Sequence, residues 1–168
     1  MTVEDRVRRL EDRAALDDLI VRYFLAADGD DMDGIRASFT PDATFASSGM
    51  INATDRQAIA QFIETSRARM GLTVHTPNYC LYTFVDDEHA SGLVGAHLEL
   101  VLSDQSLFGA VRYQDEYVRT EKGWLIAKRE MRTVYIAPMK DLGDVLLSDH
   151  PVRWPGIPPQ PSDCPRPS

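Results

Sequence analysis

The sequence predicts an α+β domain in which helices come first and a meandering antiparallel sheet follows. Apolar residues recur at three- and four-residue spacing across residues 4–28, which is the pattern of an amphipathic helix. Four long runs rich in β-branched and aromatic residues fill residues 73–136, and short polar stretches separate them. Long strands joined by short turns favour antiparallel pairing. The order of elements therefore argues against an alternating α/β protein.

The first elements are bounded by start and stop signals. The long helix ends at DGDDMDG, residues 28–34, because glycine and acidic residues interrupt the apolar stripe there. A short helix over about residues 32–39 follows, and Pro41 prevents it from continuing. The sequence ATFAS, residues 43–47, predicts a short strand.

A second substantial helix precedes the sheet. Thr54 and Gln57 have the spacing of a capping box, so we expect this helix to begin there and to continue to about Arg69. Gly71 then ends it. The strands of the sheet are expected at about residues 73–85, 90–103, 107–121 and 123–136, with turns at DDEH, SDQS and EKG.

One domain with a Pro-rich extension accounts for the chain. Its 168 residues, 43% of them apolar, are enough for a single hydrophobic core. We expect a domain over residues 1–148 and an arm over residues 149–168. The arm holds seven of the ten prolines and therefore forms neither a helix nor a central strand. We expect the arm to be ordered against another surface, and a neighbouring subunit is one anchor that it could have.

Charge and composition narrow the range of partners and locations. The net charge is −8 and basic residues are interleaved with acidic ones, so no basic face for nucleic acid is visible. No apolar run is long enough to span a bilayer, and the charged N-terminus lacks the apolar region of a signal peptide. Two cysteines, Cys80 and Cys164, do not make a disulfide framework. We therefore expect no nucleic-acid or membrane partner and a cytoplasmic location.

A histidine in a strand pattern is the first candidate for chemistry. His75 lies in LTVHTPNYCL, residues 72–81, where an unpaired buried imidazole would be unfavourable. A carboxylate partner would stabilise the imidazolium form and make the ring a competent base. Asp28 lies at the end of the first helix, where the macrodipole disfavours a carboxylate by roughly 0.3–1 kcal/mol, and Tyr23 flanks the same apolar stripe. From the residues alone, a structural His75 and a solvated Asp28 stay open as alternatives.

Charged residues on the later strands supply further candidates. Arg132 lies near the end of the last strand between apolar residues, and it is the basic residue there that we expect to point inward. His97 and Glu99 are two residues apart and share one face of their strand. The opposite face is apolar and consists of Val94, Ala96, Leu98, Leu100 and Leu102. We therefore expect His97 and Glu99 to face solvent.

The chain lacks the sequence motifs of the large cofactor- and metal-dependent classes. It has no G-x-S-x-G, P-loop, H-E-x-x-H or dinucleotide fingerprint. DGDDMDG does not fit a calcium loop, because a register with Gly34 at the sixth position puts Thr40 at the twelfth, where Glu belongs. We expect no cofactor and no metal, which leaves cofactor-free acid–base chemistry or no chemistry.

The order of elements and three segments resemble the SnoaL-like, scytalone dehydratase-like branch of the NTF2-like superfamily. The segments are LDDLIVRYFLAADGDDMDGIRASFTPDATF (16–45), VHTPNY (74–79) and GWLIAKREMRTVYI (123–136). The resemblance covers about residues 8–140. It implies a cone-shaped α+β barrel, in which N-terminal helices pack on a curved antiparallel sheet and a pocket is enclosed.

The resemblance also implies a site. Dehydratase-like members pair an Asp at the end of the first helix with a His on the strand after the third helix, and Asp28 and His75 occupy these places. Tyr23 matches an assisting Tyr five residues before the Asp, and Arg132 matches a basic residue that lines such pockets. An acidic pocket residue of some members has no clear match, since Leu98 stands at the aligned position.

Three functions follow as hypotheses. The first is a cofactor-independent lyase or isomerase of the dehydratase type, in which a His75–Asp28 dyad removes a proton from a hydrophobic cyclic small molecule such as a polyketide, steroid or terpenoid. Tyr23 would assist the departing or carbonyl oxygen, and Arg132 would stabilise negative charge. The second is a non-catalytic small-molecule binding or assembly subunit with the same fold. The third, an enzyme of the ketosteroid isomerase type, would need a carboxylate base such as Glu99 and ranks last.

A homo-oligomer is also expected. The apolar face of the strand at residues 90–103 exceeds what one pocket needs, and an extended arm suits a symmetric assembly. A trimer is the first expectation, by analogy with the dehydratase relatives, and a dimer is the second.

Overall fold

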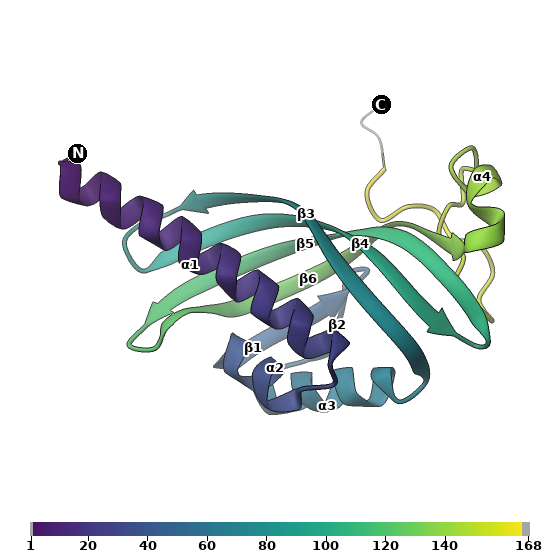
Figure 1. The fold of residues 1–168 in the computed structure, drawn as a ribbon, viewed down its shortest axis with the longest axis horizontal. Coiled ribbons are helices and arrows are strands. Elements are labelled where there is room, and N and C mark those ends of the chain that lie inside the picture. Colours follow the sequence, from purple (N-terminus) through teal and green to yellow (C-terminus); the bar gives the residue numbers. More distant parts are fainter. Residues whose placement is uncertain (1, 166–168) are drawn as a thin grey trace.

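Helices at the start of the chain cover one face of a strongly curved sheet (Figure 1). The computed structural model describes residues 2–165. Within these residues six strands form one sheet in the order β2-β1-β6-β5-β4-β3, and every neighbouring pair is antiparallel except β1 and β6. The elements are α1 (Val3–Asp28), α2 (Met32–Ser38), β1 (Phe39–Ser47), β2 (Met50–Ala53), α3 (Arg56–Arg67), β3 (Met70–Phe84), β4 (His89–Leu102), β5 (Gln105–Thr120), β6 (Gly123–Pro138), a 3₁₀ turn (Met139–Asp141) and α4 (Leu142–Val145). The predicted α+β arrangement is confirmed, with one parallel pair added.

The helices and long strands lie where the sequence predicts them, and three details differ. Strand β2 was not expected; it pairs with β1 across a tight turn at residues 48–49. Helix α3 is capped by Asp55, whose Oδ1 accepts the Ala58 N–H at 2.7 Å, so the prediction of a cap at Thr54 is wrong. The same helix ends at Arg67, and Gly71 already belongs to β3.

Helix α1 lies across the sheet and supplies much of the core. The predicted stripe is buried and consists of Leu16, Leu19, Ile20, Tyr23, Phe24 and Ala27. Val94, Ala96, Leu98 and Leu100 of β4 belong to the same core within the single chain. The apolar face of β4 is therefore no evidence for an oligomer, which corrects the argument made from the sequence. None of the helices in the described part of the chain is long and apolar enough to cross a membrane.

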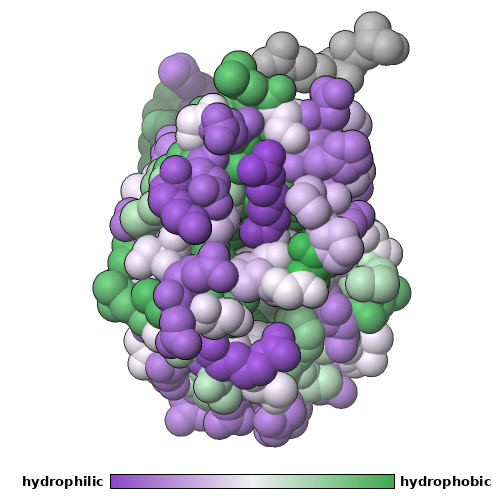
Figure 2. Space-filling model, turned by 90° about the vertical axis from the view of Figure 1, so that its right-hand side faces the viewer, coloured by the Kyte–Doolittle hydropathy of each residue, from purple (hydrophilic) through white to green (hydrophobic). Residues whose placement is uncertain are grey.

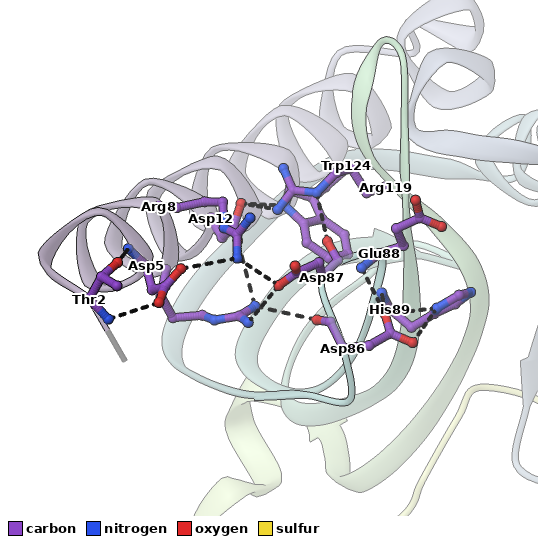
Figure 3. Close-up of polar contacts among 11 residues, drawn as sticks. Thr2, Asp5, Arg8, Asp12, Asp86, Asp87, Glu88, His89, Arg119 and Trp124 are labelled. Carbon is purple, nitrogen blue, oxygen red and sulfur yellow. Dashed lines mark hydrogen bonds and ion pairs between the residues drawn. The ribbon is translucent and has the colours of Figure 1, made fainter.

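A polar network joins the N-terminal half of α1 to the β3–β4 turn, the end of β5 and the start of β6 (Figure 3). Asp12 is buried and accepts hydrogen bonds from the Arg119 side chain of β5 and from Trp124 Nε1 of β6, the latter at 3.2 Å. Arg8 donates to Asp87 in the turn between β3 and β4 at 2.9 Å. Exposed ion pairs contribute only about 0–1 kcal/mol, so the buried hydrogen bonds of Asp12 are the stronger contacts of this network. They hold α1 at one rotation about its own axis. That rotation decides where Asp28, at the other end of α1, points.

Register shifts in β3 and β6 change which residues face the core. In β3 the register shifts at Asn78, so His75 and Tyr82 both face inward although their positions differ by an odd number. In β6 the register shifts between Ile126 and Lys128. Side chains of β6 before that shift face inward at even positions, and those directly after it face inward at odd positions such as Arg129. A further shift at Val134 returns even positions such as Ile136 to the core. Strict alternation along β6 therefore gives the wrong face between the two shifts, where Arg129 and Arg132 lie.

The C-terminal arm packs on its own chain, which corrects the expectation that a neighbouring subunit anchors it. Strand β6 continues beyond the end of β1, and the arm takes up this free edge, with Val152 bridged to Ile136. Further along, the carboxylate of Asp163 accepts the Thr133 N–H and the Ser48 hydroxyl, each at 2.8 Å. Arm and sheet are thus joined by backbone and side-chain hydrogen bonds.

Candidate active site

The last residue of α1 and a residue of β3 form a close carboxylate–imidazole pair. Asp28 Oδ1 lies 2.6 Å from His75 Nδ1, and Asp28 Oδ2 accepts the His75 backbone N–H at 2.8 Å. The helix ends here because Gly29 caps it, with its N–H bonded to the Leu25 carbonyl. The structure thus brings together two predicted site residues that lie 47 positions apart in the sequence.

Phe24 fixes the plane of the imidazole. Its ring stacks on His75 with centroids 5.0 Å apart and an angle of 7° between the ring planes. The imidazole is therefore held at one edge by Asp28 and on one face by Phe24. Its second nitrogen, Nε2, makes no hydrogen bond to any residue in the range 2–165. That nitrogen is the ring atom left free for a ligand.

A third donor helps to keep Asp28 ionised. Thr73 lies two residues before His75 on the same face of β3, and its hydroxyl donates to Asp28 Oδ1 at 2.9 Å. Burial raises the pKa of Asp28, but the hydrogen bonds from the ring and backbone of His75, the charge of that ring and the Thr73 hydroxyl outweigh burial and hold the pKa below its usual value. The carboxylate in turn favours the tautomer with hydrogen on Nδ1, which leaves Nε2 able to accept a proton.

His75 of this pair lines an apolar cavity of about 170 Å³. Residues from α1, α3, five strands and the arm line the cavity. Most of its wall is aromatic or aliphatic: Phe45, Phe62, Ile63, Met70, Leu98, Leu100, Tyr113, Met131 and Trp154. Trp154 is the contribution of the arm. Figure 2 shows the side of the molecule where these elements meet, with hydrophobic atoms visible in depth between hydrophilic side chains.

Tyr23 lies in the wall of the cavity, as predicted. Its side chain is buried in α1, and the guanidinium carbon of Arg129 lies 4.2 Å from the centre of its ring. Burial raises the pKa of Tyr23, and the positive charge of Arg129 offsets part of that rise. Tyr23 is therefore a neutral phenol in the cavity wall.

Arg132 does not face the cavity, which corrects the prediction that it points inward. Its side chain is 36% exposed and donates to Glu130 Oε1 at 3.0 Å. The bulge before Lys128 turns Arg129 inward instead, where its Nε and Nη2 donate to the two carboxylate oxygens of Asp115 at 2.9 and 2.6 Å. This fully buried ion pair lies behind the cavity wall.

His97 and Glu99 face outward, as predicted. His97 Nδ1 lies 3.3 Å from the side-chain amide of Asn78, and Glu99 is exposed. Leu98 between them lines the cavity. Among the described residues no Asp or Glu lines the cavity, so the geometry does not support Glu99 as a carboxylate base. Within residues 2–165 no group of three or more His, Cys, Asp or Glu side chains is arranged to hold a metal ion.

Several residues of the site had weak sequence signals. Thr73 shares a strand face with His75, and the spacing of two could have identified it. Phe24 belongs to the predicted stripe, but its contact with the imidazole depends on how α1 crosses β3. Arg67 and Trp154 carry no local pattern that separates them from other residues of an exposed helix end and a Pro-rich arm.

A curved sheet wrapped on N-terminal helices, with a pocket between them, defines an NTF2-like protein. Within that class, the SnoaL-like domain family matches residues 8–130, and the chain belongs to this family. The arm lies outside the matched residues. No curated protein matches the chain.

Solved structures of similar proteins support the fold. The hexachlorocyclohexane dehydrochlorinase LinA-type3 from Novosphingobium barchaimii is 23% identical, with a TM-score of 0.72 over 80% of this chain and 94% of its own. A candidate scytalone dehydratase from Novosphingobium aromaticivorans is 18% identical, with a TM-score of 0.74 over 79% of this chain and 91% of its own. An NTF2-like protein with a cystatin-like fold from the same organism is 29% identical, with a TM-score of 0.64 over 77% of this chain and 86% of its own.

Proposed function

We propose that this protein is a cofactor-independent lyase or isomerase of the dehydratase type, with His75 as its base. The observation that carries the proposal is the 2.6 Å contact between Asp28 and His75 at the border of an apolar cavity. Two proteins of the same fold are described as a dehydrochlorinase and a candidate dehydratase, and both names denote eliminations. The arrangement thus agrees with the chemistry of structural neighbours without depending on it.

The proposed step begins at His75 Nε2. This nitrogen takes a proton from a substrate carbon next to an electron-withdrawing group. The electron pair of the broken C–H bond forms a C=C bond, and the leaving group departs with the electrons of its own bond. Asp28 stabilises the imidazolium that forms and holds the ring in the useful tautomer. A positioned base of this kind contributes about 10²–10⁴-fold to the rate.

Tyr23 is the proposed partner of the substrate oxygen. Its neutral hydroxyl can donate to a carbonyl or to a departing hydroxyl, and the guanidinium of Arg129 behind its ring favours negative charge there. Arg132 lies on the outer face and has no part in this step.

The cavity volume favours a substrate of about one ring. A volume of about 170 Å³ is close to the roughly 150 Å³ of an engineered protein cavity that holds benzene, and it lies below the roughly 300–1,000 Å³ of sites for drug-sized molecules. The lining is mainly apolar. We therefore propose an uncharged, monocyclic substrate as the best fit to this cavity, ahead of the larger steroids and polyketides.

Two one-ring probes test the proposal. 3-Hydroxycyclohexanone loses water to give an ultraviolet-absorbing enone, and hexachlorocyclohexane loses HCl and releases chloride. We expect turnover of at least one probe, a loss of about 10²–10⁴-fold in His75→Gln, and no loss in His97→Gln, whose side chain faces outward. Binding without turnover, equal in the wild type and His75→Gln, would favour the alternative, a non-catalytic binding subunit.

We further propose a cytoplasmic homo-oligomer, with a trimer as the first expectation and a dimer as the second. Support comes from the edge strand β3, which has a neighbour on one side only and exposes apolar side chains on its outer face. These exposed side chains are Leu72, Val74, Tyr79 and Leu81. Sedimentation equilibrium measures the assembled mass, and a monomer at micromolar concentration would contradict the proposal.

A further inference from the structure

An arginine of α3 reaches the Asp28–His75 pair through a threonine. The side chain of Arg67 is only 12% exposed, and its Nη1 donates to Thr73 Oγ1 at 2.7 Å. Thr73 Oγ1 lies 2.9 Å from Asp28 Oδ1. One line of hydrogen bonds therefore joins the end of α3, the start of β3 and the end of α1.

The direction of these hydrogen bonds is fixed by the groups involved. A guanidinium has donors only, so the oxygen of Thr73 accepts from Arg67. The hydroxyl has a single hydrogen, and its acceptor among the described residues is Asp28 Oδ1. The Thr73 hydroxyl thus accepts from Arg67 and donates to Asp28. A hydroxyl polarised by a positively charged donor is also a stronger donor itself.

Arg67 is held away from Asp28 by its other contacts. Its Nε and Nη2 donate to the two oxygens of Asp30 at 2.7 and 3.3 Å, and Nη1 also donates to the Gly71 carbonyl at 3.2 Å. Asp30 has a φ of 55°, so the loop after α1 turns sharply between the two aspartates. Both oxygens of Asp28 consequently remain available to Thr73 and His75, and no direct ion pair with Arg67 competes with the imidazole.

We infer that Arg67 is a positioning residue that acts through the Thr73 hydroxyl to orient Asp28 and keep it ionised against His75. Replacement of Arg67 or Thr73 weakens the hydrogen bond between the Asp28 carboxylate and the His75 imidazole, while the rest of the fold is retained. The kinetic consequence rests on the proposed function, but the hydrogen-bond chain itself can be tested without a substrate.

The test is a ¹³C NMR titration of the Asp28 carboxyl carbon in the full-length protein, with the resonance assigned by Asp28→Asn. Thr73→Val is isosteric and removes one donor, so the pKa of Asp28 rises, and Thr73→Ser brings it back towards the wild-type value. Arg67→Met raises the pKa of Asp28 in the protein with Thr73. In the Thr73→Val background the same change has less than half of that effect, because the hydroxyl that carries it is gone.

Two results would overturn the inference. An unchanged pKa of Asp28 in Thr73→Val would show that the Thr73 hydroxyl does not help to keep Asp28 ionised. Equal effects of Arg67→Met in both backgrounds would mean that the arginine acts by its charge alone.

Kinetics separate this inference from the proposed function. With 3-hydroxycyclohexanone, Thr73→Val is expected to lower kcat about tenfold at unchanged KM, while Thr73→Ser stays within about twofold of the wild type. If the titration shifts as expected and kcat does not change, the hydrogen-bond chain stands and the proposed function is wrong. If kcat falls without a shift in the titration, the positioning role is wrong.

Discussion

Replacement of Arg129 by methionine is expected to destabilise the protein far more than the same replacement at Arg132. Arg129→Met leaves the carboxylate of Asp115, which is 3% exposed, with the Tyr117 hydroxyl at 2.6 Å but without its two guanidinium donors. Loss of one partner of a buried ion pair destabilises by about 3–5 kcal/mol. The Arg132–Glu130 pair is exposed enough that its loss costs only about 0–1 kcal/mol. For a chain of this size the expected fall in Tm is about 6–20 °C against at most about 4 °C.

Urea unfolding followed by circular dichroism measures both free energies of unfolding. The double replacement Arg129→Met/Asp115→Leu is the matched control, because a buried pair exchanged for apolar residues recovers most of the lost stability. If Arg132→Met were the more damaging change, Arg132 would be the inward residue of β6. The assignment of the bulge before Lys128 would then be wrong.

Three further changes probe the site and the arm. Hydrogen bonds lower the pKa of Asp28 in the fold below its unfolded value of about 3.9, so the ionised group stabilises the protein above about pH 4, and this contribution is lost as the pH falls through the folded pKa. Urea unfolding should therefore show a stability gap between the wild type and Asp28→Asn that shrinks on acidification, and a growing gap would refute the sign. Trp154→Ala enlarges the cavity, so calorimetry should show weaker binding of cyclohexanone and tighter binding of the two-ring ketone 1-tetralone; unchanged selectivity would mean that the arm does not bound the cavity. Asp163→Ala removes two hydrogen bonds of 2.8 Å and should accelerate amide hydrogen exchange in residues 149–165 but not in α1, whereas equal exchange in both proteins would show that the arm is held elsewhere.

Helix α1 could be predicted because its signal is local. The apolar stripe recurs with the helical period, and each member of it is buried where the period predicts. The end of the helix at Asp28 follows from the glycine and acidic residues after it. The contact of Asp28 with His75 joins distant segments, so no local pattern predicts it, and only the resemblance to a family points to it.

The error at Arg132 has a physical cause. Alternation in a strand assigns faces correctly only between bulges, and one extra residue near position 127 exchanges the inner and outer faces of β6 as far as the next shift at Val134. No feature of the sequence WLIAKREMR marks that bulge. Only the buried partner Asp115, on the neighbouring strand, explains why a charged residue such as Arg129 is accommodated in the core.

The arm shows a second limit of sequence reasoning. Its prolines predict an extended chain without helix or central strand, which is confirmed. Composition cannot tell which surface such a chain covers, because the choice depends on the free edge of β6 and on contacts such as that of Asp163 with Thr133. The place of Trp154 in the cavity wall could not have been predicted for the same reason.

The central claim is that His75 removes a proton from a carbon atom in the cavity. The most direct measurement is the rate at which the protein exchanges the α-protons of cyclohexanone for deuterium in D₂O, followed by ¹H NMR, because exchange requires a base and no leaving group. We predict exchange catalysed by the wild type and by His97→Gln, and a loss of about 10²–10⁴-fold in His75→Gln. Equal exchange rates in the wild type and His75→Gln would contradict the claim.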